Sequence, residues 1–280
     1  MMWGIVSDSS CDLKSGDIQS DMIRFETVPL KIRVGERDFV DNDNLYPPEL
    51  VKAMRENKAA SSTSCPSPGA FARAFAKQDR TICFTISGNL SGSYNAAVQG
   101  RELALEAHPE KEICVIDSKS TAGAMVLLIR KAKKLIESGG ERFAEICDEL
   151  RTYQASLRTC FTLENYDNLI KNGRMRPLVG TLLHTLGIHV IAVGTSEGKI
   201  QVVGKARGEE KTRKFIVSTM AGSKDCAGAK VFIHHCENLT GAVKLKELIL
   251  KELPVKSVEI MSCRGLTSFY AMEKGLIVGY

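Results

Sequence analysis

A loop rich in hydroxyl groups lies at residues 61–71, where the sequence reads Ser-Ser-Thr-Ser-Cys-Pro-Ser-Pro-Gly-Ala-Phe. Ser67 followed by Pro68 is typical of the N-cap and first position of a helix. Thr63 and Ser64 come just before that helix start, so their hydroxyls and the free N–H groups of the first turn could bind one anion. A capped helix start without a ligand is the alternative for this loop.

A second loop, Ser-Gly-Asn-Leu-Ser-Gly-Ser-Tyr at residues 87–94, has a similar composition. It follows an apolar segment that ends at Ile86 and precedes small residues that favour a helix. In an open α/β sheet, ligands bind beyond the carboxyl ends of the strands. Ser91, Gly92 and Ser93 are therefore further candidates for anion binding, with a capped helix start again as the alternative.

The motifs of several catalytic and metal sites are not matched. Residues 194–200, Gly-Thr-Ser-Glu-Gly-Lys-Ile, are one residue too short for a nucleotide-binding loop and end in Ile instead of a hydroxyl residue. Residues 90–93 lack the Gly-x-Ser-x-Gly spacing of a hydrolase nucleophile. His-His-Cys at 234–236 is expected to end a strand, because neighbouring strand residues point to opposite faces. Asp8 and Asp117 could be acids or metal ligands, but turn and cap roles are expected.

The first half of the chain must position both loops, and it alternates apolar segments with helical patterns. This order predicts a parallel sheet that is covered on both faces, as in an α/β domain. A hairpin around Gly35 is expected at its edge. The predicted strands are 3–6, 81–86 and 113–116, the hairpin strands are 28–34 and 37–40, and the helices are 50–55, 121–137 and 142–159.

The second half has a different pattern, in which a turn at Gly198 and Lys199 favours antiparallel pairing. We expect an N-terminal α/β domain at 1–159, which carries both hydroxyl-rich loops, and a C-terminal α/β domain at 160–280 with a mixed or antiparallel sheet. The predicted strands of this half are 190–193, 199–203, 231–234 and 258–260, with a helix at 211–220.

The composition excludes several classes of protein. The formal charge of +5 is mild and the basic residues are dispersed, so nucleic-acid binding is not expected. Charged residues interrupt the apolar stretches before they reach about eighteen residues, so stable membrane insertion is not expected. The nine cysteines include no Cys-x-x-Cys pair, which favours reduced thiols in the cytoplasm.

Five short motifs resemble those of the DegV family in order, spacing and context. The resemblance implies a two-domain α/β fold that holds a long-chain fatty acid in a tunnel between the domains. It also implies a carrier and not an enzyme, with no catalytic residue, cofactor or metal. The motifs are Val-Ser-Asp-Ser-Ser at 6–10, Ser-Thr-Ser-Cys-Pro-Ser-Pro at 62–68, Ser-Gly-Asn-Leu-Ser-Gly-Ser-Tyr at 87–94, Ile-Asp-Ser at 116–118 and Asn-Gly-Arg at 172–174.

In bacteria that have a fatty-acid kinase, proteins of this family present the bound acid for ATP-dependent phosphorylation, and the acyl phosphate enters phospholipid synthesis. A fatty-acid kinase is thus the partner that the resemblance implies. Two alternatives remain open. One is an enzyme for a small anionic metabolite at the same loops, with Asp8 or Asp117 as general base. The other is a lipid store or regulator without kinase coupling.

The resemblance also implies roles for single residues. Thr63 and Ser93 correspond to the hydroxyls that hold the carboxylate, and Ser64, Ser91 and Gly92 lie beside them in the same loops.

Arg174 and Arg207 correspond to family arginines at the kinase-facing mouth, with a surface salt bridge as the alternative for each. Two positions depart from the pattern. Cys65 replaces a Gln, and Cys263 stands where the family has a His that helps to hold the head group. The loss of that His bears on head-group affinity, chain preference and kinase coupling.

Overall fold

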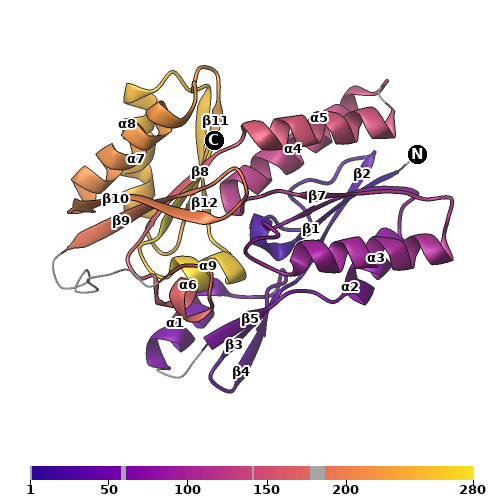
Figure 1. Ribbon diagram of the computed structural model, residues 1–280, viewed down its shortest axis with the longest axis horizontal. Helices are drawn as coiled ribbons and strands as arrows, with labels where there is room; N and C mark the ends of the chain where they lie inside the picture. Colours follow the sequence, from indigo (N-terminus) through magenta and orange to yellow (C-terminus); the bar gives the residue numbers. More distant parts are fainter. Residues whose placement is uncertain (1, 58–60, 141, 177–186) are drawn as a thin grey trace.

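The structure is a computed structural model that describes residues 2–57, 61–140, 142–176 and 187–280. Within these ranges the strands form a four-stranded, a six-stranded and a three-stranded sheet. Figure 1 shows the two larger sheets on opposite sides of the molecule and the small sheet below them. The predicted α/β class, with one parallel sheet and one mixed sheet, is confirmed.

The four-stranded sheet is parallel, in the order β2-β1-β6-β7. Its strands are apolar on both faces because helices cover both sides. Ile5 packs toward α4 and α5, whereas its neighbour Val6 packs toward α2 and α3. The elements are β1 (Trp3–Asp8), β2 (Ile23–Val28), β6 (Arg80–Thr85), β7 (Glu112–Asp117), α2 (Pro68–Phe75), α3 (Ser93–Ala107), α4 (Ala122–Ser138) and α5 (Phe143–Ser156).

The six-stranded sheet has the order β10-β9-β8-β13-β11-β12 and is antiparallel except between β11 and β12. Its last strand in sequence, β13, is inserted between β8 and β11, and the sequence patterns had not indicated it. The helices α7 and α8 cover one face. The elements are β8 (Thr159–Leu163), β9 (Ile188–Gly194), β10 (Ile200–Arg207), β11 (Lys230–His235), β12 (Ser257–Ser262), β13 (Leu276–Gly279), α7 (Glu209–Ser223) and α8 (Leu239–Glu252).

Helix α4 lies between the two larger sheets, where it contacts β1 as well as β11 and β13. Gly123 allows this approach, because a Cβ there would lie 2.9 Å from the Cβ of Phe232 on β11. The first half of the chain thus packs directly on the second, and the boundary near residue 159 stays a prediction. Although α4 is the longest of these helices, no helix in the described ranges is long and apolar enough to cross a membrane.

The small sheet corrects one prediction. Its order is β4-β3-β5, and its third strand, Ser61–Ser64, belongs to the segment that was expected to be a loop. The hairpin of β3 and β4 leaves an open edge, and Thr63 pairs there with Ile32 of β3. The remaining elements are β3 (Lys31–Val34), β4 (Arg37–Val40), β5 (Ser61–Ser64), η1 (Ser9–Cys11), α1 (Pro47–Glu56), α6 (Asp167–Lys171) and α9 (Gly265–Ala271).

Candidate functional site

A cavity of about 820 Å³, its mouth included, lies where the three sheets meet. Strands β8, β9, β10 and β13 supply one wall, and the loop after β6 and helix α9 supply others. The apolar side chains of the lining are Leu30, Ile86, Leu90, Phe161, Leu163, Leu169, Ile200, Leu266, Ala271 and Ile277.

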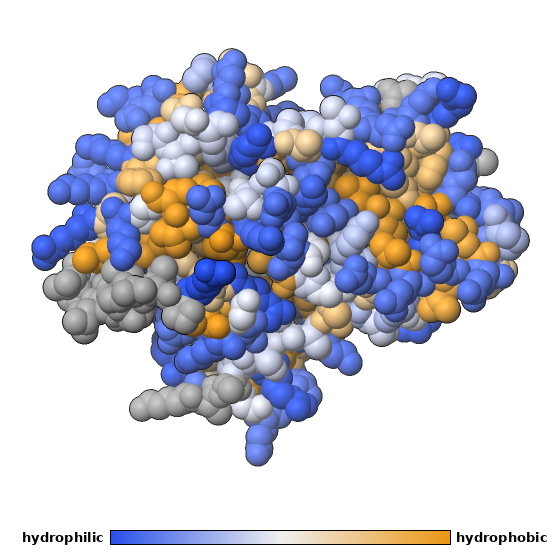
Figure 2. Space-filling view, in the orientation of Figure 1, coloured by the Kyte–Doolittle hydropathy of each residue, from blue (hydrophilic) through white to orange (hydrophobic). Residues whose placement is uncertain are grey.

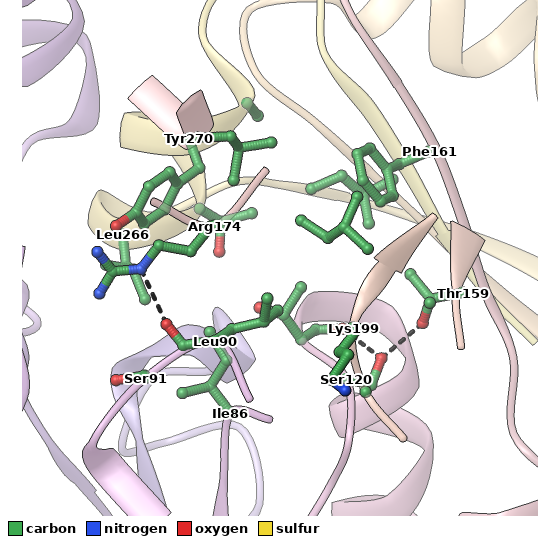
Figure 3. Close-up of a pocket in the computed structure, with 18 of the residues that line it drawn as sticks. Ile86, Leu90, Ser91, Ser120, Thr159, Phe161, Arg174, Lys199, Leu266 and Tyr270 are labelled. Atoms are coloured by element: carbon green, nitrogen blue, oxygen red, sulfur yellow. Dashed lines mark hydrogen bonds between the residues drawn. The ribbon is translucent and has the colours of Figure 1, made fainter. Parts of the chain in front are cut away.

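One end of the cavity carries hydroxyl groups. Thr63 and Ser91 come from the two hydroxyl-rich segments, and Tyr270 comes from α9. Figure 3 labels Ser91 and Tyr270 at this end. The Thr63 and Tyr270 hydroxyl oxygens are 2.9 Å apart and share one hydrogen, so the second hydrogen remains for a ligand. Ser91 Oγ accepts the N–H of Ser93 at 3.3 Å, which leaves the Ser91 hydrogen for a ligand as well. This end can therefore bind a carboxylate.

Helix packing brings the two loops together. Helices α2 and α3 lie against each other, and a Cβ at Gly100 of α3 would be 2.7 Å from the Pro68 carbonyl oxygen at the start of α2. The loops also touch directly, since a Cβ at Gly92 would lie 3.2 Å from Cys65 Sγ. Both loops therefore meet near the carboxyl ends of β1 and β6, as expected for a parallel sheet.

Ser93 does not line the cavity. It is the first residue of α3, it is fully buried, and its hydroxyl donates to Asp8 Oδ2 at 2.6 Å. Asp8 also accepts from the Ile86 N–H, and burial raises the pKa of this carboxyl. Ser93 thus ties β1 to α3, and Ser91 is the serine of this loop that lines the cavity.

Ser64 and Cys263 also lie outside the lining. Ser64 is exposed, because alternate residues of β5 point outward. Cys263 follows β12 and packs in an apolar cluster with Phe269. Burial raises the pKa of this thiol well above its usual range, so it stays neutral. Neither side chain therefore lines the cavity at its hydroxyl end.

The two predicted arginines lie in different places. Arg174 lines the cavity, and its Nε donates to the Leu90 carbonyl oxygen at 2.9 Å (Figure 3). Arg207 is exposed at the far end of β10 from the lining residue Ile200. At about 3.3 Å per residue, seven residues of strand separate them by roughly 23 Å. Arg174 is therefore at the hydroxyl end of the cavity, whereas Arg207 is not part of it.

Asp117 and His234 have structural partners. Asp117 accepts the N–H groups of Gly88 and Lys119, so it closes the loops after β6 and β7. His234 is buried on β11, and its Nδ1 lies 2.8 Å from Asp12 Oδ2. Within the described ranges, no three or more His, Cys, Asp or Glu side chains are arranged to hold a metal ion.

The family model described as "Uncharacterised protein, DegV family" matches residues 2–276. A DegV domain-containing protein of Streptococcus pyogenes serotype M18 is 37% identical over 280 residues, which cover 100% of this chain and 99% of the relative. The chain belongs to the DegV family. The resemblance noted in the sequence is confirmed.

Solved structures of DegV proteins share this fold. The Streptococcus pneumoniae Fatty Acid Kinase (Fak) B3 protein loaded with linoleic acid is 34% identical, with a TM-score of 0.95 over 100% of this chain and 99% of that chain. A DegV family protein from Eubacterium eligens loaded with heptadecanoic acid is 31% identical, with a TM-score of 0.92 over 99% of this chain and 98% of that chain.

Helix α9 of this DegV chain supplies cavity residues that the sequence reasoning missed. Tyr270 and Thr267 are one turn apart and both line the cavity. The buried Thr267 hydroxyl has no hydrogen-bond partner within the described part of the chain. Asp41 holds the start of this helix, because its carboxylate accepts the N–H groups of Gly265 and Leu266 at 2.9 and 2.8 Å. The sequence signal that could have identified these residues is their spacing, because residues three apart lie on one face of a helix.

The stability of the protein should depend on pH through Asp41. Burial raises the pKa of the Asp41 carboxyl from 3.8 to about 6, so the folded state binds a proton more tightly than the unfolded state does. The contribution of Asp41 to the free energy of unfolding is then full below about pH 4 and is lost as the pH rises through 6, by up to about 3 kcal/mol. Denaturant unfolding at pH 5 and pH 7 measures how far the free energy of unfolding falls between these pH values. This fall should be smaller for Asp41→Asn than for the parent. The exposed variant Asp21→Asn is the control, and equal differences for both variants would contradict the assignment.

Proposed function

We propose that this protein binds one long-chain fatty acid, with the carboxylate at Thr63, Ser91 and Tyr270 and the acyl chain along the apolar wall of the cavity. The observation that carries the proposal is an apolar cavity with hydroxyl donors at one end. A buried carboxylate needs such donors to replace water. About fourteen buried methylenes contribute about 11 kcal/mol before ordering costs, so the tail dominates affinity.

The two solved relatives named above hold linoleic and heptadecanoic acid, which supports the same ligand class here. The enzyme alternative is less well supported. Both of its candidate bases, Asp8 and Asp117, have their carboxylates engaged by hydrogen bonds within the fold. We therefore propose a carrier that performs no chemistry on the acid.

Mass spectrometry of the ligands released from the denatured, purified protein tests this proposal. The expected result is a stoichiometric fatty acid that is absent from an unrelated protein purified from the same cells. An empty protein that also fails to bind added fatty acid, or a polar metabolite in its place, would overturn the proposal.

We further propose that the bound carboxylate is presented to a separate fatty-acid kinase in the cytoplasm. The name of the Streptococcus pneumoniae relative supports a partner of this kind. The nine cysteines are free, and all except Cys65 are buried, as is usual for proteins of a reducing compartment. A store or regulator without kinase coupling remains the second candidate, because Cys263 replaces the family His.

Arg174→Ala should separate binding from presentation. The side chain lies at the hydroxyl end, where its charge could contact a kinase or the phosphate that is transferred. We expect fatty-acid affinity to stay within about threefold and the kinase kcat/KM to fall at least about tenfold. Arg33→Ala, at an exposed ion pair on the small sheet, is the control. A parallel loss of affinity and turnover would mean that Arg174 holds the ligand or the Leu90 loop.

A further inference from the structure

The cavity has a second polar region, away from Thr63 and Tyr270. Figure 3 shows Ser120, Thr159 and Lys199 on the side opposite Tyr270 and Arg174. Three segments meet there, namely the loop between β7 and α4, the start of β8 and the turn between β9 and β10. A cavity that served only unsubstituted acyl chains would be expected to end among apolar side chains.

Two hydroxyl groups form the centre of this region. Ser120 Oγ and Thr159 Oγ1 are 2.5 Å apart, so one hydrogen lies between them. For the second hydrogen, Ser120 Oγ has the Thr121 carbonyl oxygen as an acceptor at 3.4 Å. That contact is at the weak limit of hydrogen bonding. An oxygen atom of a ligand could accept this hydrogen at a shorter distance than the Thr121 carbonyl oxygen does.

Polar surroundings continue beyond the hydroxyl pair. A second cavity, of about 760 Å³ of empty space, shares Lys119, Ser120, Thr159 and Gly194 with the first. It is lined further by Gln154 and Arg158, among other residues. The shared residues therefore lie between the apolar first cavity and a second cavity whose lining is more polar than that of the first.

The turn between β9 and β10 is held over this region. Ser87 Oγ donates to the Gly198 carbonyl oxygen and Asn89 Nδ2 donates to the Glu197 carbonyl oxygen, both at 2.7 Å. Gly198 has a φ of +80°, and a Cβ there would lie 2.9 Å from Lys119 Cα. These hydrogen bonds fix the position of the turn, so the polar region has a defined geometry.

This region can bond to a polar group at the tail end of a ligand. A methyl group would cover the hydroxyl pair without bonding to it, whereas a hydroxyl at the same place would accept the second hydrogen and donate its own. We propose that the cavity accepts fatty acids that are oxygenated at the tail end, with Ser120 and Thr159 as the recognition pair for an ω-hydroxyl group. This inference rests on the proposed binding of fatty acids.

Calorimetric titration of delipidated protein with hexadecanoic acid and with its ω-hydroxy derivative tests the inference. We expect the parent protein to bind both acids with Kd values within about threefold. The variant Ser120→Ala/Thr159→Val should lose about tenfold in affinity for the hydroxy acid and lose none for hexadecanoic acid. Thr159→Ser, which keeps the hydroxyl, should behave as the parent.

The other outcomes are distinct from one another. If the double variant keeps its affinity for both acids, or loses affinity for both equally, the recognition pair is refuted while fatty-acid binding stands. A parent protein that binds hexadecanoic acid at least tenfold more tightly than the hydroxy acid would refute it too. If the folded parent binds neither acid, the proposed function itself fails.

Discussion

Thr63→Val combined with Ser91→Ala is expected to weaken fatty-acid binding about a hundredfold without unfolding the protein. Each hydroxyl would donate one hydrogen bond to a charged carboxylate, and two such bonds at about 1.4 kcal/mol each give this factor. The substitutions also remove the Ser91 acceptor of the Ser93 N–H and the Thr63 contact with Tyr270, so thermal unfolding of the variant must show that it remains folded. Titration with a fatty acid and with its methyl ester measures the effect.

The ester identifies the origin of the loss. It has the same tail and no negative charge, so its affinity should change much less than that of the acid. Thr152→Val/Ser156→Ala is the matched control, because both residues are exposed on α5 and donate to carbonyl oxygens of their own helix. Equal affinity of the parent and the Thr63/Ser91 variant for the acid would refute the head-group assignment.

Gly194→Leu is expected to shorten the acyl chain that the cavity accepts. Gly194 lines the far part of the cavity, and the nearest neighbour of an added Cβ is Thr159 Cβ at 3.7 Å, an ordinary contact. A leucine side chain would occupy the space of about three methylenes. At about 0.8 kcal/mol for each methylene, the longest acids should bind about fiftyfold more weakly.

A series of saturated acids of increasing length measures this change. The optimum should move to shorter acids, and acids that are too short to reach Gly194 should bind as they do to the parent. Gly222→Leu, at an exposed position of α7 where a Cβ would meet nothing, is the control. A uniform loss for every chain length would mean that the substitution distorts β9 and does not fill the tunnel.

Local patterns predicted several of the main elements. Runs of β-branched and apolar residues predicted β1, β6 and β7, because a strand that is buried on both faces has that composition wherever it lies in a sheet. The same patterns missed β2 and β8, and they also missed β5 and β13. Thr63 pairs with Ile32, and Val278 pairs with Cys160, so these strands depend on partners that are distant in the sequence.

Both hydroxyl-rich loops were identified from their composition, but the residues that face the cavity were only partly predicted. Ser93 was expected to bind the ligand, yet α3 begins at this residue and turns its hydroxyl onto Asp8 of β1. Ser91, two residues earlier, lines the cavity instead. Composition alone does not show where a helix begins relative to a neighbouring strand.

The chemical type of the ligand site follows from residues that are close in sequence, since hydroxyls beside a helix start can be recognised without a structure. The walls of the cavity depend on tertiary packing. Leu163 lines the cavity while Phe71 belongs to a dry core, although both are apolar residues that the sequence could not distinguish. Likewise, Tyr270 reaches Thr63 only because Asp41 anchors α9 beside the small sheet. An apolar wall and a core have the same composition, and only the relative placement of the sheets decides which side chains surround empty space.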